Sequence, residues 1–182
     1  MTRIAAPFGR DLSDAARVEL DALAGPRWDP GVPRVPRRAI SAPGVLNEAY
    51  RYAKPVAFSR GLRVELPGAA LLLLSGTASV DERGETAHVG DFSAQLLRTF
   101  RNLSELLAAE GADWHDVVRT TCYLRDIERD YDRFNEIRTW WYGALGLDPL
   151  PASTAIQARI CRTDLLVEIE AIAVLPAGRD VP

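Results

Sequence analysis

Hydrophobic residues at spacings of three and four predict helices in this chain. The longest such segment is residues 92–110, whose regularly spaced apolar positions are Phe92, Leu96, Leu97, Phe100, Leu103, Leu106 and Leu107. This spacing places them along one side of an α-helix, with Asp91 as the N-cap and Gly111 as the stop. The same reasoning predicts a second helix through Tyr131, Phe134, Ile137, Trp141 and Leu145. A shorter amphipathic helix is expected within residues 11–24.

Shorter apolar runs predict five strands. Residues 56–66 and 69–74 flank the turn Pro67-Gly68 and should form a hairpin. Residues 117–124 are β-branched and aromatic, as strands prefer. Residues 154–161 and 166–175 surround a turn, so we expect them to pair as a closing hairpin in which Arg159 meets a glutamate. The predicted order is therefore ββ-α-β-α-ββ.

The N-terminal part of the chain has a different composition. Prolines at positions 26, 30, 33, 36 and 43 remove amide donors, which discourages both helix and sheet interior in this stretch. We therefore expect residues 1–54 to form a short helix and a Pro-rich arm. Residues 55–182 are expected to form the packed domain.

The last predicted strand has two unlike faces. Val167, Ile169, Ala171 and Ala173 point one way, and the other face carries Leu166, Glu168, Glu170 and Ile172. Two helices that follow strands in this order should both cover one face of a mixed sheet and leave the other face open. That open face, to which we also assign Ala155, is half apolar and half acidic. Burial between copies of the chain is the simplest way to cover it, so an oligomer is expected.

Composition narrows the function. The 182 residues, 47% of them hydrophobic, suit one core rather than two domains. A net charge of −3 with interspersed signs argues against nucleic acid as the main partner. No run approaches the roughly 20 apolar residues of a membrane span, and no apolar secretory leader is present, so we expect a cytoplasmic protein without a membrane partner. Cys122 and Cys161 lack CxxC spacing and indicate two buried thiols, and with only two histidines a metal site is not expected.

Several short motifs follow one another along the chain: SGT at 75–77, Gln95 with Asn102, TCYLRD at 121–126, Asn135, Pro151 and VEIEAIAV at 167–174. Together they resemble the Rid (RidA/YjgF-like) family. Each motif is weak alone, but their order over residues 55–175 is specific. The resemblance implies an α+β fold of the chorismate-mutase-like or Rid type, with a mixed sheet and two helices on one face. It also implies a homotrimer with ligand clefts at the subunit boundaries.

The same resemblance bears on individual site residues. Imine and enamine deaminases of the family carry an arginine two residues after the proline that opens the penultimate strand, where it holds a substrate carboxylate. That position is Ser153 in this chain, and a serine cannot reproduce the bidentate fork of a guanidinium. We therefore expect ordinary imine deamination to be weak or absent. The glutamate that orients water in the family matches Glu168.

A second resemblance is to the C-terminal half of chorismatases, which share the Rid-like fold. It is carried by PVAFSRG at 55–61, LLLLSGTAS at 71–79, HVGDFSAQ at 88–95 and ICRTDLLVEIEA at 160–171. In those enzymes a cysteine and a glutamate seven residues apart line the chorismate pocket. Cys161 and Glu168 match that pair, so the resemblance implies a similar pocket.

These features predict an enzyme for a small carboxylate- or carbonyl-bearing metabolite of the imine, enamine or enol type. It would be a hydrolase or lyase, and no cofactor is expected because the sequence has no phosphate loop or dinucleotide motif. Glu168 is the expected general acid/base, because burial in an apolar cleft would raise its pKa; the other reading is an ion pair with Arg159. The substrate-binding candidates are Cys161, Arg125, Ser153, Ala155, Arg159, Gly76, Thr77 and Arg60.

Two alternatives stay open. One is chorismatase-like elimination or hydrolysis of chorismate. The other is a ligand-binding trimer that has no catalytic activity. The Cys161 and Glu168 pair favours the chorismatase-like pocket over a pocket without catalysis.

Overall fold

The computed structural model describes residues 12–23, 31–52 and 56–179. Residues 1–34 and 35–182 form separate compact units. Helix α1 (Asp14–Leu23) belongs to the first unit and has no buried residue. The hydroxyl of Ser13 accepts a hydrogen bond from the amide of Ala16 at the start of this helix, at 3.2 Å. The predicted short helix is therefore confirmed over Asp14–Leu23, while residues 11 and 24 lie outside the described part of the chain.

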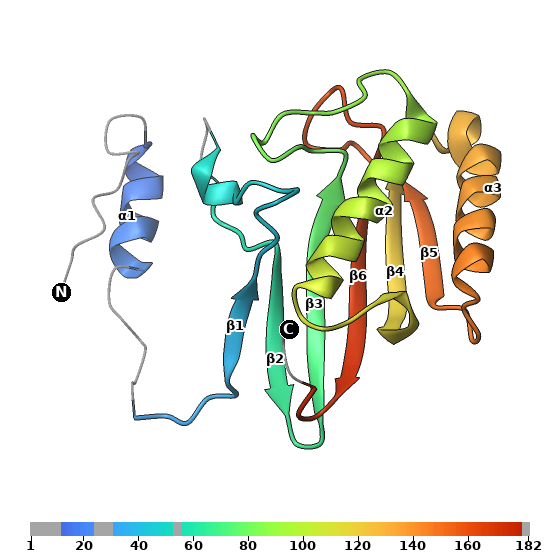
Figure 1. Cartoon of the computed structure of the whole chain (residues 1–182). Coiled ribbons are helices and arrows are strands. Elements are labelled where there is room, and N and C mark those ends of the chain that lie inside the picture. The colour runs from blue at the N-terminus through green and yellow to red at the C-terminus, as the bar shows by residue number, and fades with distance from the viewer. Residues whose placement is uncertain (1–11, 24–30, 53–55, 180–182) are drawn as a thin grey trace. The chain divides into compact units, whose positions relative to one another are not determined.

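A six-stranded sheet with the order β1-β2-β3-β6-β4-β5 forms the base of the second unit (Figure 1). Its strands are β1 (Arg37–Ile40), β2 (Gly61–Leu66), β3 (Ala69–Ala78), β4 (Val117–Leu124), β5 (Ala152–Gln157) and β6 (Val167–Pro176). All neighbouring strands are antiparallel except β4 and β5, which run parallel. The mixed sheet that the sequence predicts is thus confirmed.

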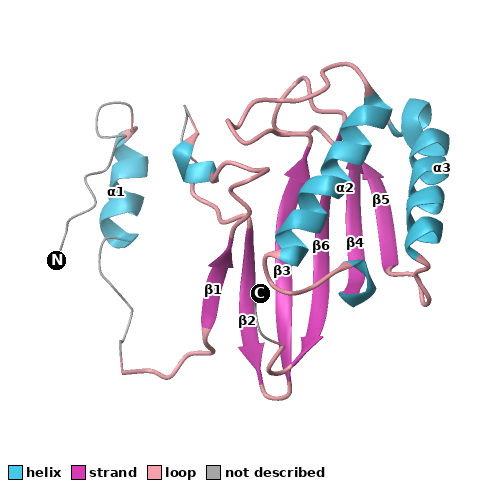
Figure 2. Cartoon of the chain, viewed as in Figure 1, coloured by secondary structure: helices cyan, strands magenta, loops and turns pink. Residues whose placement is uncertain are grey.

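Two helices cover one face of this sheet (Figure 2). Helix α2 (Phe92–Ala108) begins at Asp91, whose carboxylate accepts from the amide of Ala94 at 2.9 Å. Helix α3 (Ile127–Leu145) ends at Gly146, which has a left-handed backbone conformation. Both predicted helices and the Asp91 cap are confirmed. The apolar sides of the helices pack on the sheet to form the core, which includes Leu96, Phe100, Leu103, Phe134, Leu72, Val167 and Ile169.

Strand β1 lies inside the Pro-rich stretch, where the sequence argued against a sheet. That prediction is wrong for Arg37–Ile40, which pairs antiparallel with β2. Pro36 and Pro43 flank the strand, so neither removes a donor from within it. The loop after β1 also adds to the core through Ala42, Val45 and Leu46. The compact unit that contains these residues begins at Val35.

The last two strands do not form the predicted hairpin. β6 lies between β3 and β4, whereas β5 pairs with the other edge of β4. The reason is that β4, α3 and β5 form a βαβ unit, whose crossover helix makes β4 the parallel neighbour of β5. Arg159 therefore faces no glutamate across a hairpin and lies exposed after the end of β5. Ala155 pairs in register with the buried Cys122, so it lies on the helix-covered side and not on the open face.

The open face of the sheet has the mixed character that the alternation predicts. Along β6, residues 167, 169, 171, 173 and 175 are buried, and the residues between them are half-buried or exposed. Leu73 of β3 and Ile156 of β5 leave 37% and 43% of their surface exposed. Glu170 accepts a hydrogen bond from the hydroxyl of Tyr123 at 3.0 Å, so one of the two carboxyl groups on this face of β6 has a hydrogen-bond partner.

A buried carboxylate ties β1 to the rest of the unit. Glu110, which follows α2, is 1% exposed and accepts two hydrogen bonds from Arg38 of β1, at 2.6 and 2.5 Å. The guanidinium of Arg63 on β2, itself buried, lies 3.5 Å from the same carboxylate. Arg63 and Glu110 are both shielded from water, so each needs an oppositely charged partner; Arg63 has a second one in Glu65, at 2.6 Å. β1, β2 and the end of α2 are consequently held as one piece.

We expect Glu110→Ala to lower the free energy of unfolding by about 3 kcal/mol, because it removes the buried carboxylate that Arg38 and Arg63 share and leaves Arg63 with only the exposed carboxylate of Glu65. Urea unfolding followed by circular dichroism measures this difference. Glu136→Ala is the matched control, since it removes an exposed carboxylate paired with Arg133 on α3 and should cost no more than about 0.5 kcal/mol. Equal losses in the two variants would contradict this role of Glu110.

Candidate functional site

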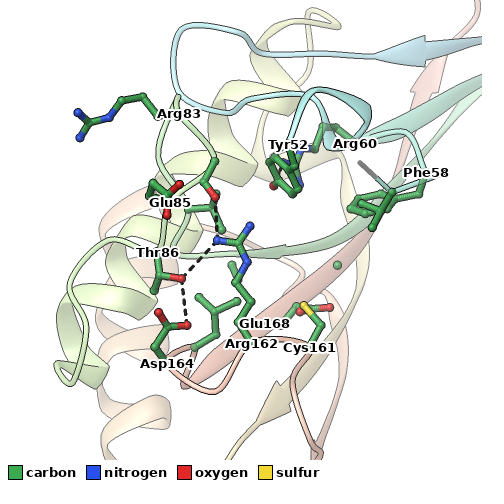
Figure 3. A pocket seen from close by; sticks show the side chains of 16 residues that line it. Tyr52, Phe58, Arg60, Arg83, Glu85, Thr86, Cys161, Arg162, Asp164 and Glu168 are labelled. Carbon is green, nitrogen blue, oxygen red and sulfur yellow. Dashed lines mark hydrogen bonds between the residues drawn. The ribbon is translucent and has the colours of Figure 1, made fainter. Parts of the chain in front are cut away.

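A cavity of about 530 Å³ opens where β3 ends and β6 begins (Figure 3). It is lined by the ends of these strands, by the loop at residues 80–86, by the segment before β2 and by the loop before β6. Its lining residues include Tyr52, Phe58, Arg60, Gly76, Thr86, Cys161, Arg162, Asp164 and Glu168. We refer to this space as the first cavity.

Glu168 enters the first cavity because of the way β3 pairs with β6. The register between these strands shifts between Leu74 and Thr77, and this irregularity sets Gly76 against the Glu168 side chain. A Cβ on Gly76 would overlap Oε1 of Glu168 and would lie 2.9 Å from its Cδ. Position 76 therefore admits only glycine while the carboxyl group keeps this position.

The carboxyl group of Glu168 is half-buried and has no hydrogen-bond or ion-pair partner among the residues that the structure describes. Burial raises the pKa of Glu168 above its ordinary value, and the nearby negative charge of Glu170 raises it further. The alternative reading, an ion pair with Arg159, is not what the structure has. A half-buried carboxyl group with a raised pKa can accept or donate a proton nearer to neutral pH than an exposed one.

Arg60 and two aromatic rings form one wall of the first cavity. The guanidinium of Arg60 donates to the carbonyl of Asn47 at 2.9 Å and to the hydroxyl of Tyr52, and it lies 5.2 Å from the Tyr52 ring centroid and 5.5 Å from that of Phe58. Arg60 is only 4% exposed and forms no ion pair within the described residues. This wall therefore presents a positive charge between flat apolar surfaces.

Arg162 lines the first cavity from the loop before β6. Its guanidinium donates to the carbonyl of Gly84 at 2.7 Å and lies 3.4 Å from the hydroxyl of Thr86, which in turn donates to Asp164 at 3.1 Å. Gly84 has a φ of +86°, and a Cβ there would lie 2.6 Å from the Tyr52 ring, so the loop packs closely onto the aromatic wall. Figure 3 shows Arg162 reaching toward Thr86, whereas Arg83 points away from the cavity.

Four of the predicted site residues meet in the first cavity: Glu168, Cys161, Gly76 and Arg60. Cys161 is exposed there as a free thiol, so the prediction that both cysteines are buried is wrong for Cys161 and holds for Cys122. The difference arises because Cys161 lies in the loop before β6 and not on a core strand.

The other predicted residues do not line this cavity. Thr77 is buried, and its hydroxyl donates to the carbonyl of Ser75 at 2.9 Å. Arg125 donates to the carbonyls of Leu165 and Ile160, at 2.5 and 3.3 Å, and to that of Arg162, so it braces the loop that carries Cys161. Arg159 is exposed outside the cavity lining.

Ser153 and Ala155 lie on the helix-covered side of the sheet. The hydroxyl of Ser153 accepts from Thr120 and from Arg138 of α3, both at 3.0 Å. It lines a second cavity of about 340 Å³, together with Arg138, Thr139, Tyr142, Gly143, Gly146, Leu147, Leu150 and Pro151. Within one copy of the chain, Ser153 and Glu168 thus serve different cavities.

Sequence reasoning missed Tyr52, Phe58 and Arg162. Tyr52 lies in the part read as an arm, and Phe58 in a segment predicted to be strand, although β2 begins only at Gly61. Arg162 was assigned to a hairpin turn. Sequence signals exist for two of these residues: the PVAFSRG run contains Phe58, and the ICRTD run contains Arg162.

The described residues contain no group of three or more His, Cys, Asp and Glu side chains placed to hold a metal ion. Helices long and apolar enough to span a bilayer are also absent from this part of the chain. The charged residues that line the first cavity are Arg60, Arg83, Arg162, Glu85, Asp164 and Glu168. Such a set suits a small polar molecule that exchanges a proton.

The sequence of this chain is similar to a known protein family and to several of its members. The family model described as endoribonuclease L-PSP matches residues 54–175. The 2-iminobutanoate/2-iminopropanoate deaminase of Mus musculus is 35% identical over 104 residues, which are 57% of this chain and 73% of that protein. The 3-aminoacrylate deaminase RutC of Acinetobacter baylyi is 28% identical over 103 residues, which are 57% of this chain and 78% of that protein. A RutC family protein of Pyrococcus abyssi is 33% identical over 103 residues, covering 56% of this chain and 76% of that protein.

Solved structures are similar over the same part of the chain. The YjgF gene product from E. coli is 25% identical with a TM-score of 0.59, and the match covers 75% of this chain and 98% of that one. RidA from an Antarctic Psychrobacter bacterium is 25% identical with a TM-score of 0.57, with the same coverage of 75% and 98%. The α+β fold predicted from the sequence is confirmed by these likenesses.

The raised pKa of Glu168 predicts a pH-dependent effect of Glu168→Gln on thermal stability. Because ionisation costs the folded state more than the unfolded state, the penalty is absent well below the ordinary value of 4.5 and grows as the pH rises above it. The variant removes the penalty, so its melting temperature should exceed that of the parent at about pH 7.5 and match it near pH 3.5.

Differential scanning calorimetry at both pH values measures this effect. Glu136→Gln is the control, because the carboxylate of Glu136 is 68% exposed and should give no such difference. A Glu168→Gln melting temperature that differs from the parent by the same amount at both pH values would show that ionisation of Glu168 does not destabilise the folded state.

Proposed function

Because this chain belongs to the endoribonuclease L-PSP family, the family of RidA and YjgF, we propose that it hydrolyses a small imine or enamine carboxylate with Glu168 as general acid/base. The reaction would add water to the C=N carbon and release a carbonyl compound and ammonia. Relatives named 2-iminobutanoate/2-iminopropanoate deaminase and 3-aminoacrylate deaminase support a deaminase-like activity on small imine or enamine metabolites. The expectation that ordinary 2-imino acids are turned over weakly stays a prediction, because Ser153 stands where such deaminases carry an arginine.

The observation that carries the proposal is the position of the Glu168 carboxyl group. It lies in the first cavity against Gly76, half-buried, without a partner among the described residues, and with a raised pKa. In its ionised form it can take a proton from water as the water oxygen bonds to the imine carbon. In its protonated form it can return that proton to the nitrogen; the C–N bond then breaks, ammonia leaves, and the carboxylate takes the hydroxyl proton as the C=O bond forms.

The charges around Glu168 suit such a substrate. Arg60 and Arg162, which form no ion pair within the described residues, supply guanidinium groups that can contact an anionic group of a metabolite. The rings of Tyr52 and Phe58 offer flat surfaces for the conjugated C=N or C=C–N group. Glu168 would be the only one of these groups that changes its protonation state during the reaction.

We also propose that the protein works as a homotrimer with its ligand sites at subunit boundaries. The open sheet face supports this arrangement, because it exposes the apolar side chains of Leu66, Leu73, Ile156 and Val174. An apolar surface of this kind is normally covered, and a second copy supplies a matching face.

Chorismatase-like chemistry is the second candidate. It is favoured by Cys161 and Glu168, which both line the first cavity, as the resemblance to chorismatases implies. A cavity of about 530 Å³ has room for a ring with two acidic substituents. In this reaction Glu168 would protonate the CH2 carbon of the enolpyruvyl ether of chorismate. Water would add to the resulting oxocarbenium carbon, and the bond from that carbon to the ring oxygen would break, which releases pyruvate and leaves a ring hydroxyl.

We expect Glu168→Gln to lower turnover by roughly 100- to 10,000-fold, because the amide keeps the shape of the side chain and loses the proton. The assay measures ammonia released from 2-iminobutanoate generated in situ and from 3-aminoacrylate, with a parallel assay of pyruvate released from chorismate. Release of ammonia by the parent supports deamination, and release of pyruvate alone supports the second candidate.

Glu170→Gln is the matched control on the same strand. Glu170 accepts a hydrogen bond from Tyr123 and does not line the first cavity, so this variant should keep most of the activity. Full activity in Glu168→Gln, or a larger loss in Glu170→Gln, would show that the general acid/base has been assigned to the wrong carboxylate. Absence of all three activities in the parent would favour a non-catalytic ligand-binding protein.

The trimer is tested by its mass. Light scattering after size-exclusion chromatography should give about three times the chain mass of 20.0 kDa at micromolar concentration. Leu73→Glu places a charge on the exposed apolar part of β3 and should shift the mass toward that of the monomer. A monomeric parent protein would overturn the proposed assembly.

A further inference from the structure

The second cavity is a separate space with its own charged group. Its walls are mostly apolar, and they include Leu147, Leu150 and Pro151. Arg138 of α3 is the one charged side chain among the residues that line it. An apolar space with a single charged group is typical of sites for small organic ions.

Arg138 carries a positive charge that nothing in the described chain neutralises. Its guanidinium donates to the neutral oxygens of Asn135, at 2.5 Å, and Ser153, at 3.0 Å. No carboxylate of the described residues forms an ion pair with it, whereas Arg129 and Arg133 on the same helix each pair with an acidic residue. Arg138 is thus the unneutralised cation of this helix surface.

The guanidinium is also held in place before any ligand arrives. It lies 4.7 Å from the centroid of the buried Phe134 ring, and the two hydrogen bonds fix its plane between α3 and β5. A pre-oriented guanidinium loses little rotamer freedom when it binds a planar anion. Its remaining donors suit the two oxygens of a carboxylate.

We propose that Arg138 binds the carboxylate of the substrate in the second cavity and that it does so from a different copy of the chain than the one that supplies Glu168. This inference rests on the proposed function. Arg138 then performs from helix α3 the task that Ser153 on strand β5 cannot perform. The substrate class is narrowed to a carboxylate whose apolar part fits beside Leu147 and Leu150.

The need for two copies follows from the sheet. Ser153 pairs in register with Thr120, and Thr120 pairs with Ala171, which faces the helices. Glu168 is three residues before Ala171 on β6, so it points to the opposite face. One small molecule cannot touch Arg138 and Glu168 of the same chain, but it can touch both where the helix-covered edge of one copy meets the open face of another.

The binding step is tested with 2-oxobutanoate, the product expected from 2-iminobutanoate, and with the uncharged 2-oxobutanamide. Calorimetric titration should show that Arg138→Ala weakens binding of the acid by roughly 10- to 100-fold and leaves binding of the amide unchanged. Arg138→Lys should give an intermediate loss, because lysine keeps the charge and lacks the fork. Arg133→Ala on the same helix is the control and should bind as the parent does.

A second-site variant separates a lost contact from a damaged fold. Ser153 already lines the second cavity, so Ser153→Arg in the Arg138→Ala background places a guanidinium there from strand β5. Recovery of acid binding in this double variant supports the inference. If Arg138→Ala binds the acid as tightly as the parent does, the inference is wrong, whatever Glu168→Gln shows.

Mixed trimers test the division between copies. When Glu168→Gln and Arg138→Ala chains are refolded together in equal amounts, about a quarter of the boundaries should carry both native residues and regain activity. Mixtures that stay as inactive as the separate variants would overturn the placement on different copies. If Glu168→Gln alone keeps full activity, it is the proposed function that fails, and the binding titrations still decide the role of Arg138.

Discussion

The antiparallel pairing of β3 with β6 is the constraint on which the candidate site depends. Its register runs regularly from Ala69 to Leu74 and then shifts before Thr77. The shift sets a glycine against the side chain of Glu168, where any larger residue would push the carboxyl group away. It also keeps this carboxyl group partly out of water, which is the physical cause of its raised pKa.

The segment before β2 supplies the aromatic wall of the first cavity, which the sheet alone does not provide. β1 is held by Arg38 and Glu110, and the loop that follows it packs into the core. This anchoring brings the carbonyl of Asn47 and the ring of Tyr52 to Arg60, so that a buried guanidinium is fixed between aromatic rings. The first cavity is therefore formed by two parts of the chain, the segment before β2 and the adjoining ends of β3 and β6.

Charge is distributed unequally between the two faces of the sheet. The open face carries the carboxyl groups of Glu168 and Glu170 together with the guanidinium of Arg119, and the helix-covered edge carries the unneutralised guanidinium of Arg138. Glu168 and Arg138, which form no ion pair within the described residues, would attract each other if these surfaces approached in an assembly. A small acid bound between them would contact a cation at one end and a proton-transferring group at the other.

The sequence by itself determined the elements whose signals are local. The helix at 92–108 follows from apolar spacing and from the carboxylate cap at Asp91, and the helix at 127–145 follows from the apolar spacing between Tyr131 and Leu145, because such signals act within one or two turns of the chain. The alternation along β6 likewise assigned Glu168 to the uncovered face, since successive side chains of a strand point in opposite directions. The resemblance to the family then favoured Glu168 over Glu170 as the general acid/base.

Only the tertiary structure decided which elements are neighbours. Two strands that are close in sequence looked like a hairpin, but the crossover through α3 makes β5 a partner of β4 and leaves β6 to pair with β3 and β4. For the same reason the sequence could not bring Tyr52 to Arg60, or Arg138 to Ser153, since the residues of each pair belong to different elements. Contacts of this kind depend on how distant segments pack, and no periodicity within a single segment records them.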